Sequence, residues 1–159
     1  MPTFTYSVLI NTTPEKVFAH ITDFSNHGSW YEYPWRVESR SPGAMGVGSQ
    51  FRSIADDSFG KQIPDEISVT KYQSPTRFCF VCKDPRYPFP TVHEFTIRAQ
   101  DSATLLERQF ISKPGFPFNM LNPLVSVIEP FLGRTAMLRS MNKIKANMEG
   151  KKSGLPHPP

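Results

Sequence analysis

Long apolar runs are missing from this 159-residue sequence. A membrane-spanning helix needs about 20 consecutive apolar residues, and the most apolar stretch, from Leu121 to Leu132, is interrupted by prolines and polar residues. The charged region that opens a secretory signal is missing too, because the first basic residue is Lys16. These absences predict a soluble, cytoplasmic protein without an integral membrane segment.

Cysteine is scarce, with Cys79 and Cys82 as the two copies. Their spacing is also found in redox pairs and in zinc sites. However, residues 77–83 have the pattern of a strand, on which positions three apart point to opposite faces, whereas redox pairs of this spacing begin a helix. A zinc site would need further Cys or His residues at ligand spacing, which the sequence lacks. We therefore predict two reduced thiols, no metal and no cofactor.

Acidic residues are too few to balance the basic ones, since 18 Lys and Arg stand against 14 Asp and Glu, a formal net charge of +4. A basic excess is one property of nucleic-acid-binding proteins. Here it is concentrated late in the chain, at Arg134, Arg139, Lys143, Lys145, Lys151 and Lys152. Cations in the last turns of a helix complement the helix dipole. We therefore assign the charge to a helix end and expect no nucleic-acid partner.

The N-terminal part predicts a strand followed by two short helices. Apolar and polar residues alternate over residues 3–10, as in a half-buried strand. Residues 11–15 then supply a helix start, with threonines that can cap, a proline for the first turn and a glutamate near the positive helix end. A second short helix or turn carries Trp30. We assign His20 and His27 to the surface of these helices.

Short strands dominate the middle of the chain. The candidates are Trp35 to Arg40, Val47 to Ile54, Glu66 to Gln73, Arg77 to Lys83, Thr91 to Ala99 and Thr104 to Ser112. Turn-forming residues lie between them, and the proline-rich segment 84–90 is a predicted loop. Short strands with short connections predict an antiparallel sheet.

A long amphipathic helix is predicted from Pro123 to Glu149. Its apolar positions form two stripes, rotated against each other by roughly a third of a turn, and Pro130 favours a bend because it removes a helix hydrogen bond. We expect the first half to cover the sheet and the second half to pack elsewhere; alternatively, the regular helix begins only at Pro130. The chain is then one domain, residues 1–150, with a disordered tail, residues 151–159.

This order of elements resembles the START-like superfamily, the polyketide cyclase/dehydrase and lipid-transport group. The segments that carry the resemblance over residues 3–149 are Ser7 to Phe18, Asp23 to Trp30, Val47-Gly48, Ser74 to Phe78, and Thr104 with the terminal helix. The resemblance implies an α+β helix-grip fold: a curved antiparallel sheet of about seven strands, two short helices and a long C-terminal helix around an apolar cavity. It implies no catalytic motif, because the superfamily hosts binders, transfer proteins, cyclases and chaperone-like members.

Strand alternation predicts which polar side chains enter such a cavity. His93 and Arg108 fall on the same faces as apolar residues of their own strands. Arg108 could bind an anionic oxygen through its planar guanidinium, and His93 could exchange a proton near neutral pH, so both are candidate catalytic residues. The alternatives are that His93 is a satisfied wall residue, and that Arg108 pairs with Glu94 or Glu107 on a register shifted by one residue.

Large apolar side chains around this cavity are the candidate ligand-binding residues. They are Trp30, Phe51, Phe78, Phe80, Phe95, Phe110, Phe131 and Leu138. This set, in the absence of a nucleophile motif, favours the binding of a hydrophobic or amphipathic small molecule such as a lipid, a sterol or a polyketide-like aromatic. The inward His and Arg favour instead a cyclase- or dehydratase-type enzyme. A third hypothesis is a chaperone-like module with a protein partner.

Overall fold

The computed structural model describes residues 3–31, 35–56, 62–83, 89–112 and 122–150. The elements are β1 (Thr3–Ile10), α1 (Pro14–Thr22), the 3₁₀ helix η1 (Phe24–Ser29), β2 (Trp35–Ser39), β3 (Gln50–Asp56), β4 (Gln62–Gln73), β5 (Arg77–Lys83), β6 (Thr91–Gln100), β7 (Ala103–Ser112) and α2 (Asn122–Glu149). The predicted tail, residues 151–159, and most of the predicted loop 84–90 lie outside the described residues.

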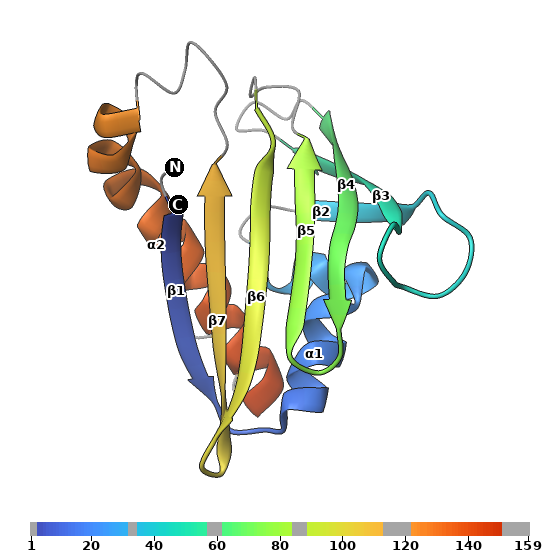
Figure 1. The fold of residues 1–159 in the computed structure, drawn as a ribbon, viewed down its shortest axis with the longest axis vertical. Coiled ribbons are helices and arrows are strands. Elements are labelled where there is room, and N and C mark those ends of the chain that lie inside the picture. Colours follow the sequence, from blue (N-terminus) through green and yellow to red (C-terminus); the bar gives the residue numbers. More distant parts are fainter. Residues whose placement is uncertain (1–2, 32–34, 57–61, 84–88, 113–121, 151–159) are drawn as a thin grey trace.

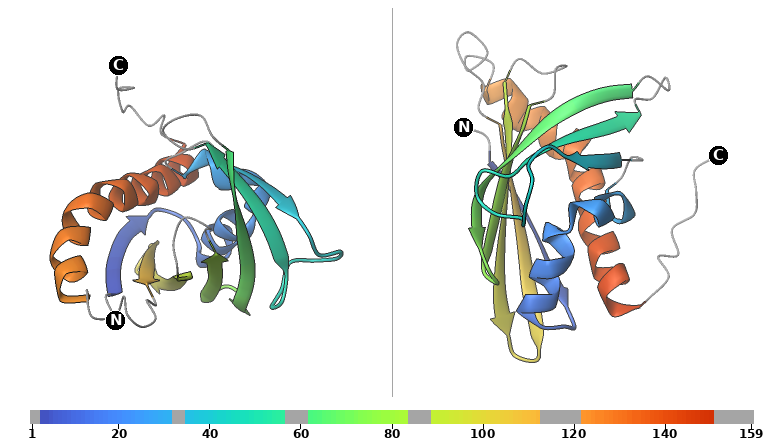
Figure 2. Two further views of the ribbon diagram at one scale, coloured as in Figure 1. Left: turned by 90° about the horizontal axis from the view of Figure 1, so that it is seen from above. Right: turned by 90° about the vertical axis from the view of Figure 1, so that its right-hand side faces the viewer.

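The strands form one seven-stranded sheet in the order β1-β7-β6-β5-β4-β3-β2 (Figure 1). Every neighbouring pair is antiparallel. The sheet is curved, and α1, η1 and α2 all lie on its concave side (Figure 2). The predicted α+β helix-grip architecture is confirmed.

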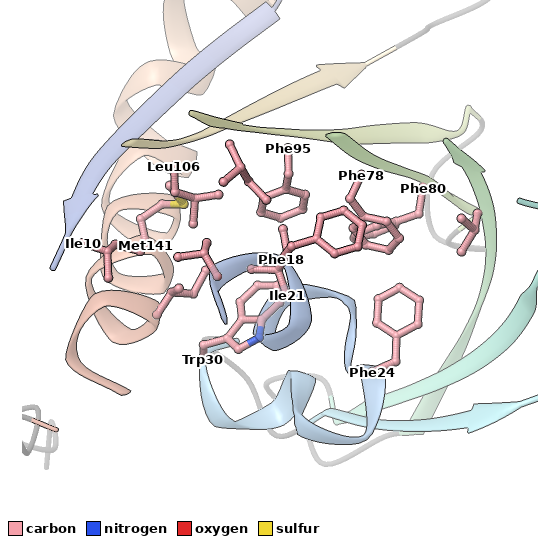
Figure 3. Close-up of a cluster of buried hydrophobic side chains, with 14 of the residues drawn as sticks. Ile10, Phe18, Ile21, Phe24, Trp30, Phe78, Phe80, Phe95, Leu106 and Met141 are labelled. Carbon is pink, nitrogen blue, oxygen red and sulfur yellow. The ribbon is translucent and has the colours of Figure 1, made fainter. Parts of the chain in front are cut away.

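The junction between the first strand and the short helices follows from its local sequence. Pro14 occupies the first turn of α1, where a missing N–H costs nothing because that group has no helical partner. The residues of α1 that become buried are Val17, Phe18, Ile21 and Thr22. Asp23 then caps η1, since its side chain accepts a hydrogen bond from the Ser25 N–H at 3.1 Å. Trp30 follows η1 directly and lies in the core on the concave side of the sheet (Figure 3).

The core lies between the concave face and the three helices, and it is rich in aromatic rings (Figure 3). Its aromatic members are Phe18, Phe24, Trp30, Phe78, Phe80 and Phe95. Phe78 and Phe95 stack with ring centroids 6.3 Å apart, and Phe24 meets Phe80 edge to face at 5.4 Å. Such arrangements add to the stability that burial of the rings already supplies.

The third strand begins later than its apolar pattern predicts. Gly48 has a φ of +89°, a left-handed conformation that strands do not adopt, and Val47 beside it is 68% exposed. The Gly48 N–H still donates to the Val69 carbonyl at 2.9 Å. Residues 47–49 are therefore a turn that leads into β3 rather than part of the strand.

The terminal helix contradicts one expectation and one alternative. It is continuous from Asn122, so the alternative start at Pro130 is wrong. Its axis bends between the N-terminal and C-terminal parts (Figures 1 and 2). The expectation that the second half packs elsewhere is also wrong, because Met141 and Ile144 belong to the core and Met148 packs against it. Methionine suits such positions because its flexible side chain adapts to irregular packing.

Basic residues near the end of α2 fasten this helix to the remainder of the domain. Lys143 donates to the Tyr31 carbonyl at 3.1 Å, and Lys145 donates to the Leu9 carbonyl. Glu149 pairs with Lys145 and accepts a hydrogen bond from the backbone N–H of Asn11 at 2.9 Å. Part of the late basic charge therefore has a structural role, in docking the helix.

We expect Ile144→Ala to lower the free energy of unfolding by about 2–5 kcal/mol, because Ile144 is fully buried and its truncation leaves a cavity. Leu138→Ala, on the same helix, is the matched control, since Leu138 is 37% exposed and its loss should cost well under half as much. Urea unfolding measures both. Equal losses, or a larger loss for Leu138→Ala, would contradict the packing of the C-terminal half on the sheet.

Candidate functional site

The structure brings the two predicted polar residues together on the concave face. Arg108 on β7 is 1% exposed and His93 on β6 is 5% exposed. In the register of these strands Phe95 lies opposite Arg108, and Phe110 lies opposite His93. The Arg108 Nη2 donates to the His93 Nδ1 at 2.8 Å. The two strands therefore build a buried polar pair that is enclosed by apolar side chains.

The alternative pairing of Arg108 with an acidic neighbour is wrong. Glu94 instead binds Lys71, with 2.9 Å between Nζ and Oε1. Glu107 accepts a hydrogen bond from the Gln109 side chain at 3.4 Å. Because strand side chains alternate between faces, these carboxylates lie on the face opposite Arg108.

The remaining contacts of Arg108 come from a helix and from aromatic rings. Its Nη1 donates to the Ser140 Oγ of α2 at 3.3 Å. The guanidinium carbon lies 5.7 Å from the centroid of the Trp30 ring and 5.2 Å from that of Phe95, within the range of cation–π attraction. Within the described part of the chain, Arg108 has no carboxylate partner, and its Nε has no hydrogen-bond acceptor.

His93 is a neutral imidazole with a defined tautomer. A guanidinium only donates hydrogen bonds, so the Nδ1 that meets Arg108 acts as acceptor and the ring proton sits on Nε2. Burial, and then the positive charge of Arg108, hold the pKa of His93 well below its ordinary value. The ring stacks on Phe80 at 4.9 Å and meets Phe110 edge to face at 5.1 Å.

The charge of Arg108 is only partly offset by its surroundings. Burial lowers the pKa of Arg108, whereas Tyr31 and Cys82 raise it by favourable electrostatic interaction. Arginine starts from so high a pKa that it remains protonated. The concave face therefore holds a permanent cation next to a neutral histidine.

His27 also belongs to this buried site, although its sequence position predicted a surface group. It is fully buried, with ring centroids 4.3 Å from Phe24 and 4.1 Å from Trp30. Burial is the main cause of its strongly lowered pKa, followed by the positive charge of Arg108. The spacing Phe24, His27, Trp30 is a three-residue repeat that places all three on one face of a 3₁₀ helix. That repeat could have identified His27 as a buried residue.

Ser140 is the second residue that sequence patterns missed. It precedes Ile144 by four positions, so both share one face of α2. Ser140 is 3% exposed and meets Arg108 from the helix side. A small polar residue inside an apolar stripe is a weak signal, which explains the omission.

The predicted ligand-binding residues occupy three different environments. Trp30, Phe78, Phe80 and Phe95 are buried in the core, and Phe51 packs against it half-buried. Phe110 is half-buried beside His93. Leu138 is 37% exposed and is therefore not a buried wall residue. The side chain of Phe131 lies outside the described residues.

Other reactive groups in the described part of the chain are few. No group of three His, Cys, Asp or Glu side chains is placed there to hold a metal. Cys79 and Cys82 are buried and form no disulfide. Among these same residues no helix is long and apolar enough to cross a membrane.

The curved sheet closed by α2, with a buried polar pair beneath the helix, defines a START-like helix-grip domain. The model of the polyketide cyclase/dehydrase and lipid-transport family matches residues 1–149, and the chain belongs to this family. A search of curated proteins found no match.

Solved structures resemble this fold at low sequence identity. A Rhodobacter sphaeroides protein has a TM-score of 0.73 at 12% identity, covering 94% of this chain and 93% of its own. A START superfamily protein from Mycobacterium smegmatis has a TM-score of 0.68 at 15% identity, covering 93% and 97%. The Aha1 dimer from Colwellia psychrerythraea has a TM-score of 0.63 at 17% identity, covering 96% and 100%. At these identities the likeness concerns the fold alone.

The lowered pKa values of His27 and His93 predict that acid destabilises the protein. In the unfolded chain both imidazoles take up a proton near pH 6.5, while in the folded protein they stay neutral to lower pH. The unfolded state therefore binds more protons below about pH 6.5. The free energy of unfolding should fall there by up to about 1.4 kcal/mol per pH unit for each histidine, and these groups should not affect it above that pH.

Urea unfolding at about pH 7.5 and about pH 5.5 measures this loss. A His27→Gln/His93→Gln double variant is the control. It should lose most of the pH dependence whatever its stability at the higher pH. A double variant with the same pH dependence as the natural sequence would show that these histidines do not cause the effect.

Proposed function

We propose that this protein binds a hydrophobic or amphipathic small molecule between the concave face of the sheet and α2. The observation that carries the proposal is the buried Arg108–His93 pair inside an aromatic enclosure. Ligand sites in proteins are mostly apolar, with a few polar groups that orient the ligand. Membership of a family described by polyketide cyclases and lipid transport supports the same reading.

The position of the site is inferred from where the core is filled. Ile10 and Leu106 lie beside Met141 of the C-terminal half of α2 (Figure 3), and Leu106 is close to the β6–β7 turn. His93 and Phe110 lie toward the opposite ends of β6 and β7, on the side of the N-terminal half of α2 (Figure 1). Phe110 is only half-buried, unlike the residues of the filled end. We therefore assign the ligand to the end that carries His93.

Binding is favoured over acid–base catalysis by the state of His93. A general base needs a free lone pair within reach of the substrate proton. The lone pair of the His93 Nδ1 is already engaged by Arg108, whose charge also opposes protonation of the ring. The ring is thus suited to orient a ligand rather than to remove a proton from it. A cyclase- or dehydratase-type activity is the second candidate, supported by the proximity of the same two residues.

The proposal predicts that the purified protein binds Nile red, a neutral apolar dye, with increased fluorescence. Phe110→Ala should weaken this binding by about tenfold or more, because an aromatic surface that the ligand would cover is lost. Leu9→Ala is the matched control, since Leu9 is an exposed apolar residue of β1. It should leave the dissociation constant unchanged.

Native mass spectrometry of the freshly purified protein complements the dye. A small molecule retained with the natural sequence, and lost in Phe110→Ala, supports the proposal. The proposal is overturned if the protein carries no added mass and also fails to bind the dye. Equal effects of Phe110→Ala and Leu9→Ala would overturn the assignment of the site to this end of the sheet.

A further inference from the structure

We propose that the ligand is an acid: a mostly apolar molecule with one anionic oxygen group, such as a carboxylate, that binds Arg108. This inference rests on the proposed function and names the chemical class of the ligand for the same site. It follows from the charge balance and from the hydrogen-bond balance of the described residues around Arg108.

The charge balance is incomplete. A buried cation is costly unless an opposite charge compensates it. Arg108 is buried to 1% exposure, yet no described carboxylate forms an ion pair with it. The groups that raise its pKa by electrostatic interaction are Tyr31 and Cys82. A phenol and a thiol are ordinarily uncharged near neutral pH, so neither supplies a full opposite charge. The electrostatic environment of Arg108 therefore favours the binding of one negatively charged group.

The surroundings of Arg108 compensate the charge only in part. The faces of Trp30 and Phe95 supply cation–π attraction, and Ser140 and His93 each accept one hydrogen bond. All four of these partners are neutral. They keep the guanidinium in a fixed orientation between sheet and helix, as a preorganised anion site requires.

The hydrogen-bond balance points in the same direction. Two N–H groups in this cluster, the Arg108 Nε and the Trp30 Nε1, are buried without an acceptor among the described residues. Both groups can only donate. The accepting nitrogen of His93 is already used by Arg108. What these two N–H groups lack is an acceptor placed to meet them. An ionised carboxylate accepts hydrogen bonds without bringing a donor of its own.

Neutral and cationic ligands match these demands less well. An alcohol brings a hydroxyl donor together with its acceptor, and carries no charge. An amine cation would place a second positive charge beside Arg108. Hydrogen bonds between a guanidinium and a carboxylate are among the stronger ones in proteins, and they are often bidentate. The site should therefore discriminate by charge among ligands of the same apolar shape.

The test compares matched acid and alcohol probes at neutral pH by displacement of Nile red. The pairs are dodecanoate with dodecan-1-ol, and 2-naphthoate with 2-naphthalenemethanol. We expect the acid of at least one pair to bind about tenfold or more tightly than its alcohol, as a charged hydrogen bond implies. In Arg108→Met the acid should lose this advantage, so that the acid and the alcohol of a pair bind within about threefold of each other.

The outcomes separate this inference from the proposed function. If Nile red and the alcohols bind but the acids bind no more tightly to the natural protein, ligand binding stands and the acid inference is overturned. If neither Nile red nor any probe binds, the proposed function itself fails. The comparison of acid with alcohol in the natural protein does not depend on the variant, so it remains decisive if Arg108→Met does not fold. An acid preference that survives unchanged in a folded Arg108→Met would also overturn the inference.

Discussion

One buried cation determines how the concave face of this protein is built. The guanidinium of Arg108, on β7, donates to His93 on β6 and to Ser140 on α2, and it lies against Trp30 at the end of η1. A single side chain thus joins two central strands to the closing helix and to the short-helix layer. Burial of a guanidinium is costly where its charge and its N–H groups are not compensated. The neighbours of Arg108 must therefore supply hydrogen-bond acceptors or aromatic faces at these positions.

Two consequences of this cation extend through the site. Histidines near Arg108 are kept neutral by burial and by its charge, so His93 accepts a hydrogen bond where it would otherwise titrate near neutral pH. Aromatic faces take the place of carboxylates around the cation, which leaves the site apolar enough for a hydrophobic ligand. Met141 and Ile144 fill the core under the C-terminal half of α2, and the ligand that we propose would bind toward the other end of the sheet.

Local sequence patterns predicted the fold and the central pair because both depend on short-range rules. Strand alternation placed His93 and Arg108 on the inner face, and the paired register of β6 and β7 then brings them into contact. Other features depend on tertiary packing. The repeat of Phe24, His27 and Trp30 indicates one face of a 3₁₀ helix, but only the tertiary packing makes this face the buried one. Val47 begins an apolar pattern that predicts a strand, but the backbone of Gly48 turns there. In the second half of the long helix, Met141 and Ile144 enter the core, which the apolar pattern of the helix alone does not predict.

The state of the Arg108–His93 pair is tested most directly by the ring nitrogens of His93 in a ¹⁵N–¹H NMR spectrum of the natural protein near neutral pH. Our account predicts a neutral ring with its proton on Nε2 and an unprotonated Nδ1 that accepts the hydrogen bond from Arg108. The signals should stay unchanged as the pH is lowered through about 6.5, the ordinary histidine value. A positively charged ring, or a proton on Nδ1, would contradict the account, because neither could accept a hydrogen bond from the guanidinium.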